Sequence, residues 1–177
     1  HGAVFFSEWV NGQIIGYDLN EAARTEGVEK ILNWKDIPGK NQMGAVVEDE
    51  PCLSNGTLLF RGQAVFLLAA KTREISRQAL RKIKVTASEQ PGIVTLEDAI
   101  KADSFFGPEQ TLRRGDAHMA ILKSEFTAEG VLQTGGQEHW YLETQCALCI
   151  PGENQKISIY SSSQNPSETQ AIVAEVL

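Results

Sequence analysis

The feature that most constrains the fold is an apolar run followed at once by an amphipathic helical pattern. Residues 63–70 are almost wholly apolar, which predicts a strand covered on both faces. Thr72 then stands where a helix N-cap is expected, and the apolar residues from Ile75 to Ile83 recur at helical spacing. Residues 84–87 fit a returning strand. The sequence therefore predicts a layered fold in which a helix packs on a sheet.

The remaining elements are predicted from alternation, caps and turn residues. Asn20 is predicted to cap a short helix that Gly27 ends, Thr95 to open a helix through Ala102, and Asn165 to cap a C-terminal helix. The stretches 35–41 and 49–56 carry turn chemistry. Further strands are predicted over residues 13–18, 28–34, 57–60 and 156–161, the last half-buried, and residues 147–150 form an apolar run.

Composition and charge limit the kind of partner. The chain has 177 residues, of which 42% are hydrophobic and 22% charged, as in soluble globular proteins. A net charge of -7 argues against binding to nucleic acid or to an anionic membrane surface. The longest apolar run, near residues 64–70, is far shorter than a membrane span. Small molecules or other proteins are the expected partners.

The two ends of the chain and its cysteines indicate where the protein resides and whether the sequence is an excerpt. The first residues lack an export signal, and three cysteines are too few for a disulfide-stapled secreted domain. We therefore expect a soluble cytoplasmic protein. The chain begins at His1 without an initiator Met and stops at Leu177 inside an apolar helical pattern. Both ends favour an excerpt from a longer chain.

Cys146 and Cys149 form a C-x-x-C pair, for which zinc or redox chemistry is one hypothesis. In a strand, an offset of three residues would point the two thiols to opposite faces, and no second pair of ligands is present. Structural cysteines are the favoured interpretation. The sequence also lacks a Walker loop, a G-x-G-x-x-G motif and a G-x-S-x-G elbow, so glycine-rich phosphate binding and hydrolase chemistry have no support.

Gly135, Gly136 and Gln137 form the strongest candidate site. Two glycines let the backbone approach a bulky group closely, and the Gln137 amide offers a donor and acceptors to a metal-oxo ligand or a pterin. The alternative is a turn before a buried segment, in which Trp140, Tyr141 and Leu142 form core. Residue types and spacing alone leave both interpretations open.

The ten residues 135–144, Gly-Gly-Gln-Glu-His-Trp-Tyr-Leu-Glu-Thr, resemble a motif of xanthine dehydrogenases and aldehyde oxidases, where Phe commonly stands in place of Trp140. Residues 161–170 and 173–177 resemble the next block of that family. Upstream, residues 36–41, 49–51, 62–63 and 95–100 resemble its α/β hammerhead domain. The resemblance covers nearly the whole chain.

The resemblance implies an α/β (α+β) fold with a hammerhead-type mixed sheet, followed by a partial second α/β unit. It places the hammerhead domain at residues 1–105, a connector at 106–130 and the truncated start of a molybdopterin-binding domain at 131–177. The implied activity is hydroxylation of a heterocycle or aldehyde carbon with oxygen derived from water at a molybdenum centre. Iron-sulfur clusters and FAD on other domains or subunits accept the electrons. The implied partners are those domains, the remainder of the molybdopterin-binding domain and a second copy in a homodimer or higher oligomer.

By the same resemblance, Gln137 hydrogen-bonds the oxo group of the metal without ligating it, while Gly135 and Gly136 allow the close approach. No catalytic residue falls within this sequence, because the family's base and its substrate-orienting residues lie in later blocks. The isolated chain is therefore expected to be inactive and to hold no molybdenum. The residues that choose the substrate lie outside it as well.

Two other classes of function remain as alternatives. A non-catalytic assembly or binding module would keep the hammerhead shape without the cofactor. The presence of Gln137 beside two glycines favours the enzyme, because such a module has no need of that amide. A small zinc or redox protein would use Cys146 and Cys149 and would require both thiols on one surface.

Overall fold

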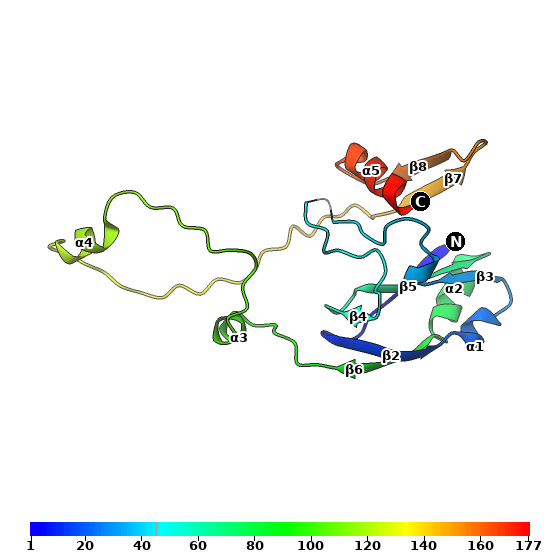
Figure 1. The fold of residues 1–177 in the computed structure, drawn as a ribbon, viewed down its shortest axis with the longest axis horizontal. Coiled ribbons are helices and arrows are strands. Elements are labelled where there is room, and N and C mark those ends of the chain that lie inside the picture. Colours follow the sequence, from blue (N-terminus) through cyan, green and yellow to red (C-terminus); the bar gives the residue numbers. More distant parts are fainter. Residues whose placement is uncertain (45) are drawn as a thin grey trace. The chain divides into compact units, whose positions relative to one another are not determined.

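The computed structural model describes residues 1–44 and 46–177, and its contacts divide the chain into two units. The first unit comprises His1–Ile93 and Ala147–Leu177, and the second comprises Val94–Cys146. The first unit contains nearly all of the regular structure (Figure 1). Its strands are β1 (Gly2–Phe6), β2 (Gly12–Asp18), β3 (Val28–Leu32), β4 (Thr57–Leu58), β5 (Ala64–Ala70), β6 (Lys84–Glu89), β7 (Ala147–Pro151) and β8 (Ile157–Ser161). Its helices are α1 (Asn20–Ala23), the short 3-10 helix η1 (Trp34–Asp36), α2 (Arg73–Leu80) and α5 (Pro166–Val176).

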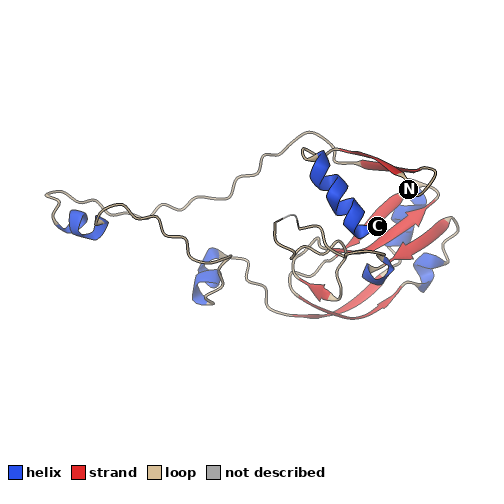
Figure 2. Ribbon diagram, turned by 45° about the horizontal axis from the view of Figure 1, so that its top comes forward, coloured by secondary structure: helices blue, strands red, loops and turns tan. Residues whose placement is uncertain are grey.

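Two three-stranded sheets and one hairpin organise these strands. The first sheet has the order β1-β5-β3, the second has the order β4-β2-β6, and β7 pairs with β8. The strand pairs among the described residues are antiparallel. Helices and sheets are combined in the first unit, which confirms the predicted fold class (Figure 2).

Strand β5 is the centre of the first sheet, but it is not covered on both faces as predicted. Phe66, Leu68 and Ala70 are buried, whereas Leu67 is 39% exposed and Ala69 is also exposed. The alternation arises because successive side chains of a strand point to opposite faces. Val65, next to Phe66, is buried as well, so the exposed positions of the strand are Leu67 and Ala69.

Phe66 links the two sheets. Its ring lies 5.9 Å from that of Phe5 on β1 and 5.1 Å from that of Tyr17 on β2, the latter edge to face. Aromatic pairs at these distances stabilise beyond the area they bury. Phe66 is also among the largest fully buried side chains of the described residues. The buried core cluster around Phe66 also takes Leu58 of β4 and Ala79 of α2.

Helix α2 covers one face of the first sheet, and its predicted cap is confirmed. The Thr72 hydroxyl accepts a hydrogen bond from the Ile75 amide, as an N-cap residue should. Ala79 is fully buried in the core cluster. Gly27 has a φ of +85°, and a Cβ there would lie 2.7 Å from the Ile75 side chain. Glycine at this position therefore allows both the backbone conformation and the close approach of α2.

The helix predicted after Asn20 is shorter than expected and is not capped by Asn20. Leu19 occupies the N-cap position, and the Asp18 carboxylate accepts the Asn20 amide at 2.9 Å. Helix α1 ends at Ala23, before Gly27. This hydrogen bond, which stabilises the carboxylate, lowers the pKa of Asp18.

The predicted strand over residues 28–34 is also shorter, because Asn33 begins helix η1. The Asn33 side chain accepts from the Lys35 amide, while the Asp36 carboxylate accepts from the Asn33 amide. This is a reciprocal capping arrangement. The spacing of Asn33 and Asp36 was the sequence signal for it.

Strand β8 and helix α5 match their predicted positions, and the apolar run at residues 147–150 forms strand β7, which pairs with β8. The Asn165 side chain accepts from the Glu168 amide, and Pro166 occupies the first turn of α5. β8 alternates as predicted, but its side chains are exposed in this structure, Ile159 least among the isoleucines at 37%.

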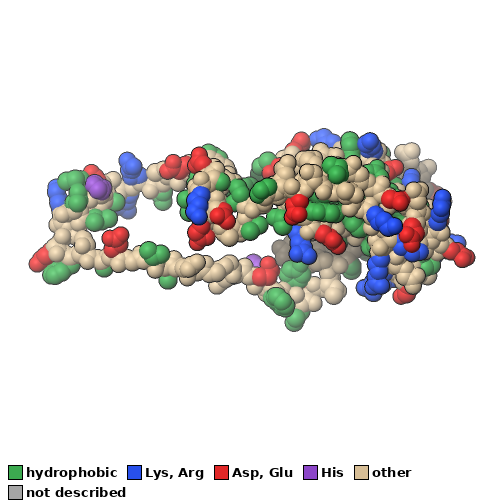
Figure 3. Space-filling view, turned by 90° about the horizontal axis from the view of Figure 1, so that it is seen from below, with side chains coloured by type: hydrophobic (Ala, Val, Ile, Leu, Met, Phe, Trp, Pro, Cys, Tyr) green, Lys and Arg blue, Asp and Glu red, His purple; other side chains and the backbone are tan. Residues whose placement is uncertain are grey.

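The second unit has no core of its own. It contains α3 (Leu96–Lys101), capped by Thr95 as predicted, and α4 (Ala117–Leu122), joined by segments without helix or strand. All of its residues are described, and none of them is buried. Its hydrophobic side chains lie at the surface, in green in Figure 3. Across the described residues, no helix combines the length and the apolar character that crossing a membrane requires.

The two faces of β5 allow a matched test of the core. We expect Leu68→Ala to lower the free energy of unfolding by about 2–5 kcal/mol, because it leaves a cavity beside Phe66. Leu67→Ala, one residue away, is expected to cost about 1 kcal/mol or less, since its side chain keeps much of its exposure to water. Urea unfolding followed by circular dichroism measures both. Equal losses for the two variants would contradict this assignment of faces.

Candidate functional site

The predicted motif lies in the second unit, in a segment without helix or strand. The residues from Gly135 to Thr144 are all exposed. Among the residues the structure describes, the Gln137 amide has no hydrogen-bond partner. Trp140 adopts a φ of +52° and is 82% exposed. The alternative in which Trp140, Tyr141 and Leu142 form core therefore has no support in the structure.

Gly135 and Gly136 offer room rather than an unusual backbone conformation. Neither glycine has a φ in the left-handed region. A Cβ built at either position would meet no described atom within 4 Å. The missing side chains therefore leave free space beside the backbone next to Gln137, which suits the approach of a bulky group.

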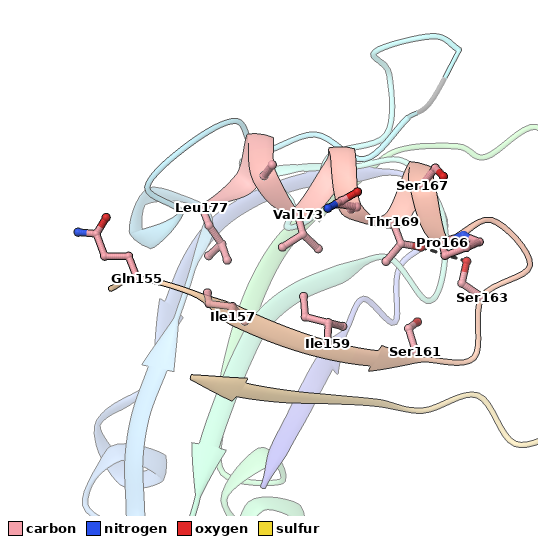
Figure 4. A pocket seen from close by; sticks show the side chains of 12 residues that line it. Gln155, Ile157, Ile159, Ser161, Ser163, Pro166, Ser167, Thr169, Val173 and Leu177 are labelled. Atoms are coloured by element: carbon pink, nitrogen blue, oxygen red, sulfur yellow. Dashed lines mark hydrogen bonds between the residues drawn. The ribbon is translucent and has the colours of Figure 1, made fainter. Parts of the chain in front are cut away.

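A second feature, which the sequence analysis did not single out, is a groove of about 610 Å³ between β8 and α5. Ile157 and Ile159 point from β8 towards Val173 and Leu177 of the helical segment (Figure 4). The alternation in β8 and the spacing of four residues between Val173 and Leu177 were the signals that place these side chains on facing surfaces.

The groove has a polar end. Thr169 donates from its hydroxyl to the Ser163 hydroxyl at 3.0 Å, a hydrogen bond drawn in Figure 4. The same Thr169 hydroxyl lies 3.1 Å from the Asn165 carbonyl. These contacts hold the start of α5 close to the end of β8.

The cysteines do not assemble a metal site within residues 1–44 and 46–177. Cys149 lies in β7 and Cys146 directly before it, and both are exposed. No group of three or more His, Cys, Asp or Glu side chains able to hold a metal ion occurs in this described part of the chain. Cys52 is partly buried, and burial raises the pKa of its thiol.

Two family models together match almost the whole chain. Residues 1–91 match the model for the a/b hammerhead domain of aldehyde oxidase and xanthine dehydrogenase, over more than half of the chain. The chain belongs to this family. Residues 100–177 match the model for a molybdopterin cofactor-binding domain. Gln137 and both glycines fall within that second match.

The family's curated members include similar proteins from distant organisms. Xanthine dehydrogenase of Dictyostelium discoideum is 37% identical over 167 residues, which cover 94% of this chain and 12% of that protein. Aldehyde oxidase 3 of Rattus norvegicus is 36% identical over 177 residues, which cover 99% of this chain and 13% of that protein. The chain thus spans about an eighth of the length of these relatives.

Solved structures of two oxidoreductases share the fold of this chain. The aldehyde oxidoreductase from Desulfovibrio desulfuricans superposes with a TM-score of 0.88 and 22% identity over all of this chain and 22% of that one. Quinoline 2-oxidoreductase from Pseudomonas putida 86 gives a TM-score of 0.82 and 22% identity over 99% of this chain and 25% of that one. These matches show that this chain shares its fold with the corresponding parts of both proteins.

The environments of the cysteines predict different thiol reactivities. Because the raised pKa of Cys52 leaves less thiolate at a given pH, we expect iodoacetamide to modify Cys52 several times more slowly than Cys149 at pH 8. Raising the pH further should reduce the difference between the two modification rates. Mass spectrometry of timed samples measures both rates, with the urea-unfolded chain as control. Equal rates in the folded chain would contradict the partial burial of Cys52.

Proposed function

We propose that this chain forms part of the molybdenum-cofactor-binding region of a xanthine dehydrogenase-like hydroxylase. The observation that carries the proposal is the match of residues 100–177 to a molybdopterin cofactor-binding domain, with Gln137 and its two glycines inside it. The reaction is the insertion of water-derived oxygen into a carbon of a heterocycle or an aldehyde. In the complete enzyme, the bound molybdenum cofactor supplies the oxygen-transfer and redox chemistry.

The proposed domains follow one another along the chain. Residues 1–105 form the hammerhead domain, 106–130 a connector and 131–177 the first part of the cofactor-binding domain. The family-model matches over residues 1–91 and 100–177 support the order of the hammerhead and cofactor-binding domains, the second match including the proposed connector. The hammerhead has its own buried core, whereas the motif-bearing segment has none.

Gln137 is proposed to donate a hydrogen bond to an oxygen of the metal centre without ligating the metal. The described residues support a contact of this kind, because the Gln137 amide has no partner among them and lies beside open space at Gly135 and Gly136. A neutral amide suits an anionic oxygen, which a carboxylate would repel. The described chain offers no cluster of metal-ligating side chains, so it contributes a contact and not the metal's ligands.

The remaining partners follow from the proposed reaction. Electrons leaving the substrate require acceptors, which we assign to iron-sulfur clusters and FAD on other domains or subunits. The rest of the molybdopterin-binding domain would complete the site, and the whole enzyme would act in the cytoplasm as a homodimer or a higher oligomer. The small share of the relatives' length that this chain spans is consistent with most of these parts lying elsewhere.

The 177-residue chain by itself is expected to hold no molybdenum, because it supplies one amide contact and no cluster of metal ligands in its described part. Elemental analysis after expression in a host that makes the cofactor measures this. A full-length relative purified in parallel is the positive control. Stoichiometric molybdenum in the isolated chain would overturn the assignment of the other contacts to missing parts.

Substituting Gln137 in a full-length protein that carries this segment tests the proposed contact. We expect Gln137→Ala to lower kcat/KM by roughly 10–100-fold while molybdenum content stays near the parent value. Gln137→Glu should lower it at least as much, because a carboxylate repels the oxygen.

Gln133→Ala is the matched control, because Gln133 is an exposed glutamine four residues away and outside the motif. It should leave both kcat/KM and molybdenum content unchanged. Gln137→Ala with the same activity as Gln133→Ala would exclude the proposed role. A full-length protein without molybdenum or hydroxylase activity would instead favour the non-catalytic assembly module.

A further inference from the structure

The loop between η1 and β4 is tied to the hammerhead by Asn41. Its side-chain amide donates to the Leu53 carbonyl at 2.7 Å, and its side-chain oxygen accepts from the Leu53 amide at 2.9 Å. Leu53 is buried, with 2% of its surface exposed. This two-way bond therefore fixes the start of the loop onto a buried residue of the first unit.

Gln42 closes the other part of the loop. Its side-chain oxygen accepts from the amides of Met43, Gly44 and Glu50 at 2.8, 2.8 and 3.0 Å. The Met43 amide also donates to the Glu50 carbonyl at 2.8 Å. One side chain thus satisfies three backbone donors and holds residues 42 and 50 together.

The segment just before Asn41 contacts the last turn of helix α5. The Gly39 amide donates to the Val176 carbonyl at 2.9 Å, and the Lys40 amide donates to the Glu175 carbonyl at 2.8 Å. In this structure the hammerhead loop supplies those donors.

Glycine at position 39 is required by this contact. A Cβ there would collide with the Glu175 carbonyl oxygen and would lie 3.0 Å from the Val176 carbonyl carbon, both backbone atoms. The φ of Gly39 is outside the left-handed region. Glycine is therefore needed at this position for close approach and not for its conformational freedom.

Lys40 adds charge to the same contact. Its ammonium lies 3.3 Å from the carboxylate of Glu175 on α5 and 3.3 Å from that of Glu48 in the loop. These two carboxylates raise the pKa of Lys40. All three side chains are more than half exposed, so the ion pairs stabilise the contact less than the backbone hydrogen bonds do.

We propose that Gly39 and Lys40 form a clamp by which the hammerhead loop holds helix α5 and sets its position. The clamp joins residues matched by the hammerhead model to residues matched by the cofactor-binding model. Asn41 and Gln42 hold the loop in the shape that presents the two amides. The coupling between these parts is a property of the polypeptide and does not rest on the bound cofactor.

Hydrogen exchange in the 177-residue chain tests the clamp directly. In the parent chain the amides of Gly39 and Lys40 should be protected. Gly39→Ala should lower protection of the Lys40 amide by about tenfold, the effect of losing a hydrogen bond of about 1.4 kcal/mol. Protection in the last turn of α5 should fall with it, while amides of β5 stay unchanged.

Gly16→Ala is the matched control, because a Cβ at Gly16 meets open space and its φ is not left-handed. It should leave exchange in α5 unchanged. Unprotected amides at Gly39 and Lys40 in the parent chain would overturn the clamp. So would equal exchange in α5 for Gly39→Ala and Gly16→Ala.

Lys40→Met keeps the backbone bonds and tests the charge if Gly39→Ala does not fold. We expect exchange in the last turn of α5 to rise roughly twofold, in line with an exposed ion pair, and the difference to vanish in about 0.5 M salt. Lys71→Met is the control, since Lys71 pairs with Glu29 at 3.9 Å, away from α5. Equal exchange in α5 for the two variants would remove Lys40 from the clamp. None of these readouts involves molybdenum or activity, so the result is independent of the proposed function.

Discussion

The burial of side chains of β5 is the constraint on which the first unit depends. Phe66 and Leu68 belong to a core cluster that also contains Ala79 of α2, Phe5 of the same sheet packs against this cluster, and the Phe66 ring contacts Tyr17 of the second sheet. Apolar burial of this kind is the main favourable term in folding. Because strands from both sheets contribute to the contact with Phe66, the two sheets and the helix are stabilised together.

Stability and candidate function lie in different parts of the chain. The core belongs to the first unit, whereas Gln137 and its glycines lie in a second unit that has no buried residue. A segment without buried apolar surface lacks the free energy to offset its own ordering. The motif therefore needs surfaces outside its own unit to hold Gln137 in one position, and the proposed cofactor contact is consistent with that need.

The loop that precedes β4 shows how backbone groups connect neighbouring parts. Asn41 and Gln42 satisfy backbone groups within the loop, which leaves the amides of Gly39 and Lys40 free to meet the end of α5. Ile157 and Ile159 of β8 and Val173 and Leu177 of the helical segment line the groove between β8 and α5. The position of α5 is thus governed by donors from a distant part of the sequence and by its own apolar face.

The sequence by itself determined the local elements and the family motif. Thr72, Thr95 and Asn165 act as caps because an N-cap needs only a side-chain oxygen and the next turn of backbone. Tertiary structure decided what depends on distant neighbours. Strand β6 pairs with β2 and not with β5, Leu67 is exposed, and Gly39 meets α5 across more than a hundred residues. The spacing of residue types along the sequence does not reveal these contacts, because strand pairing and burial depend on which distant segments the folded chain brings together.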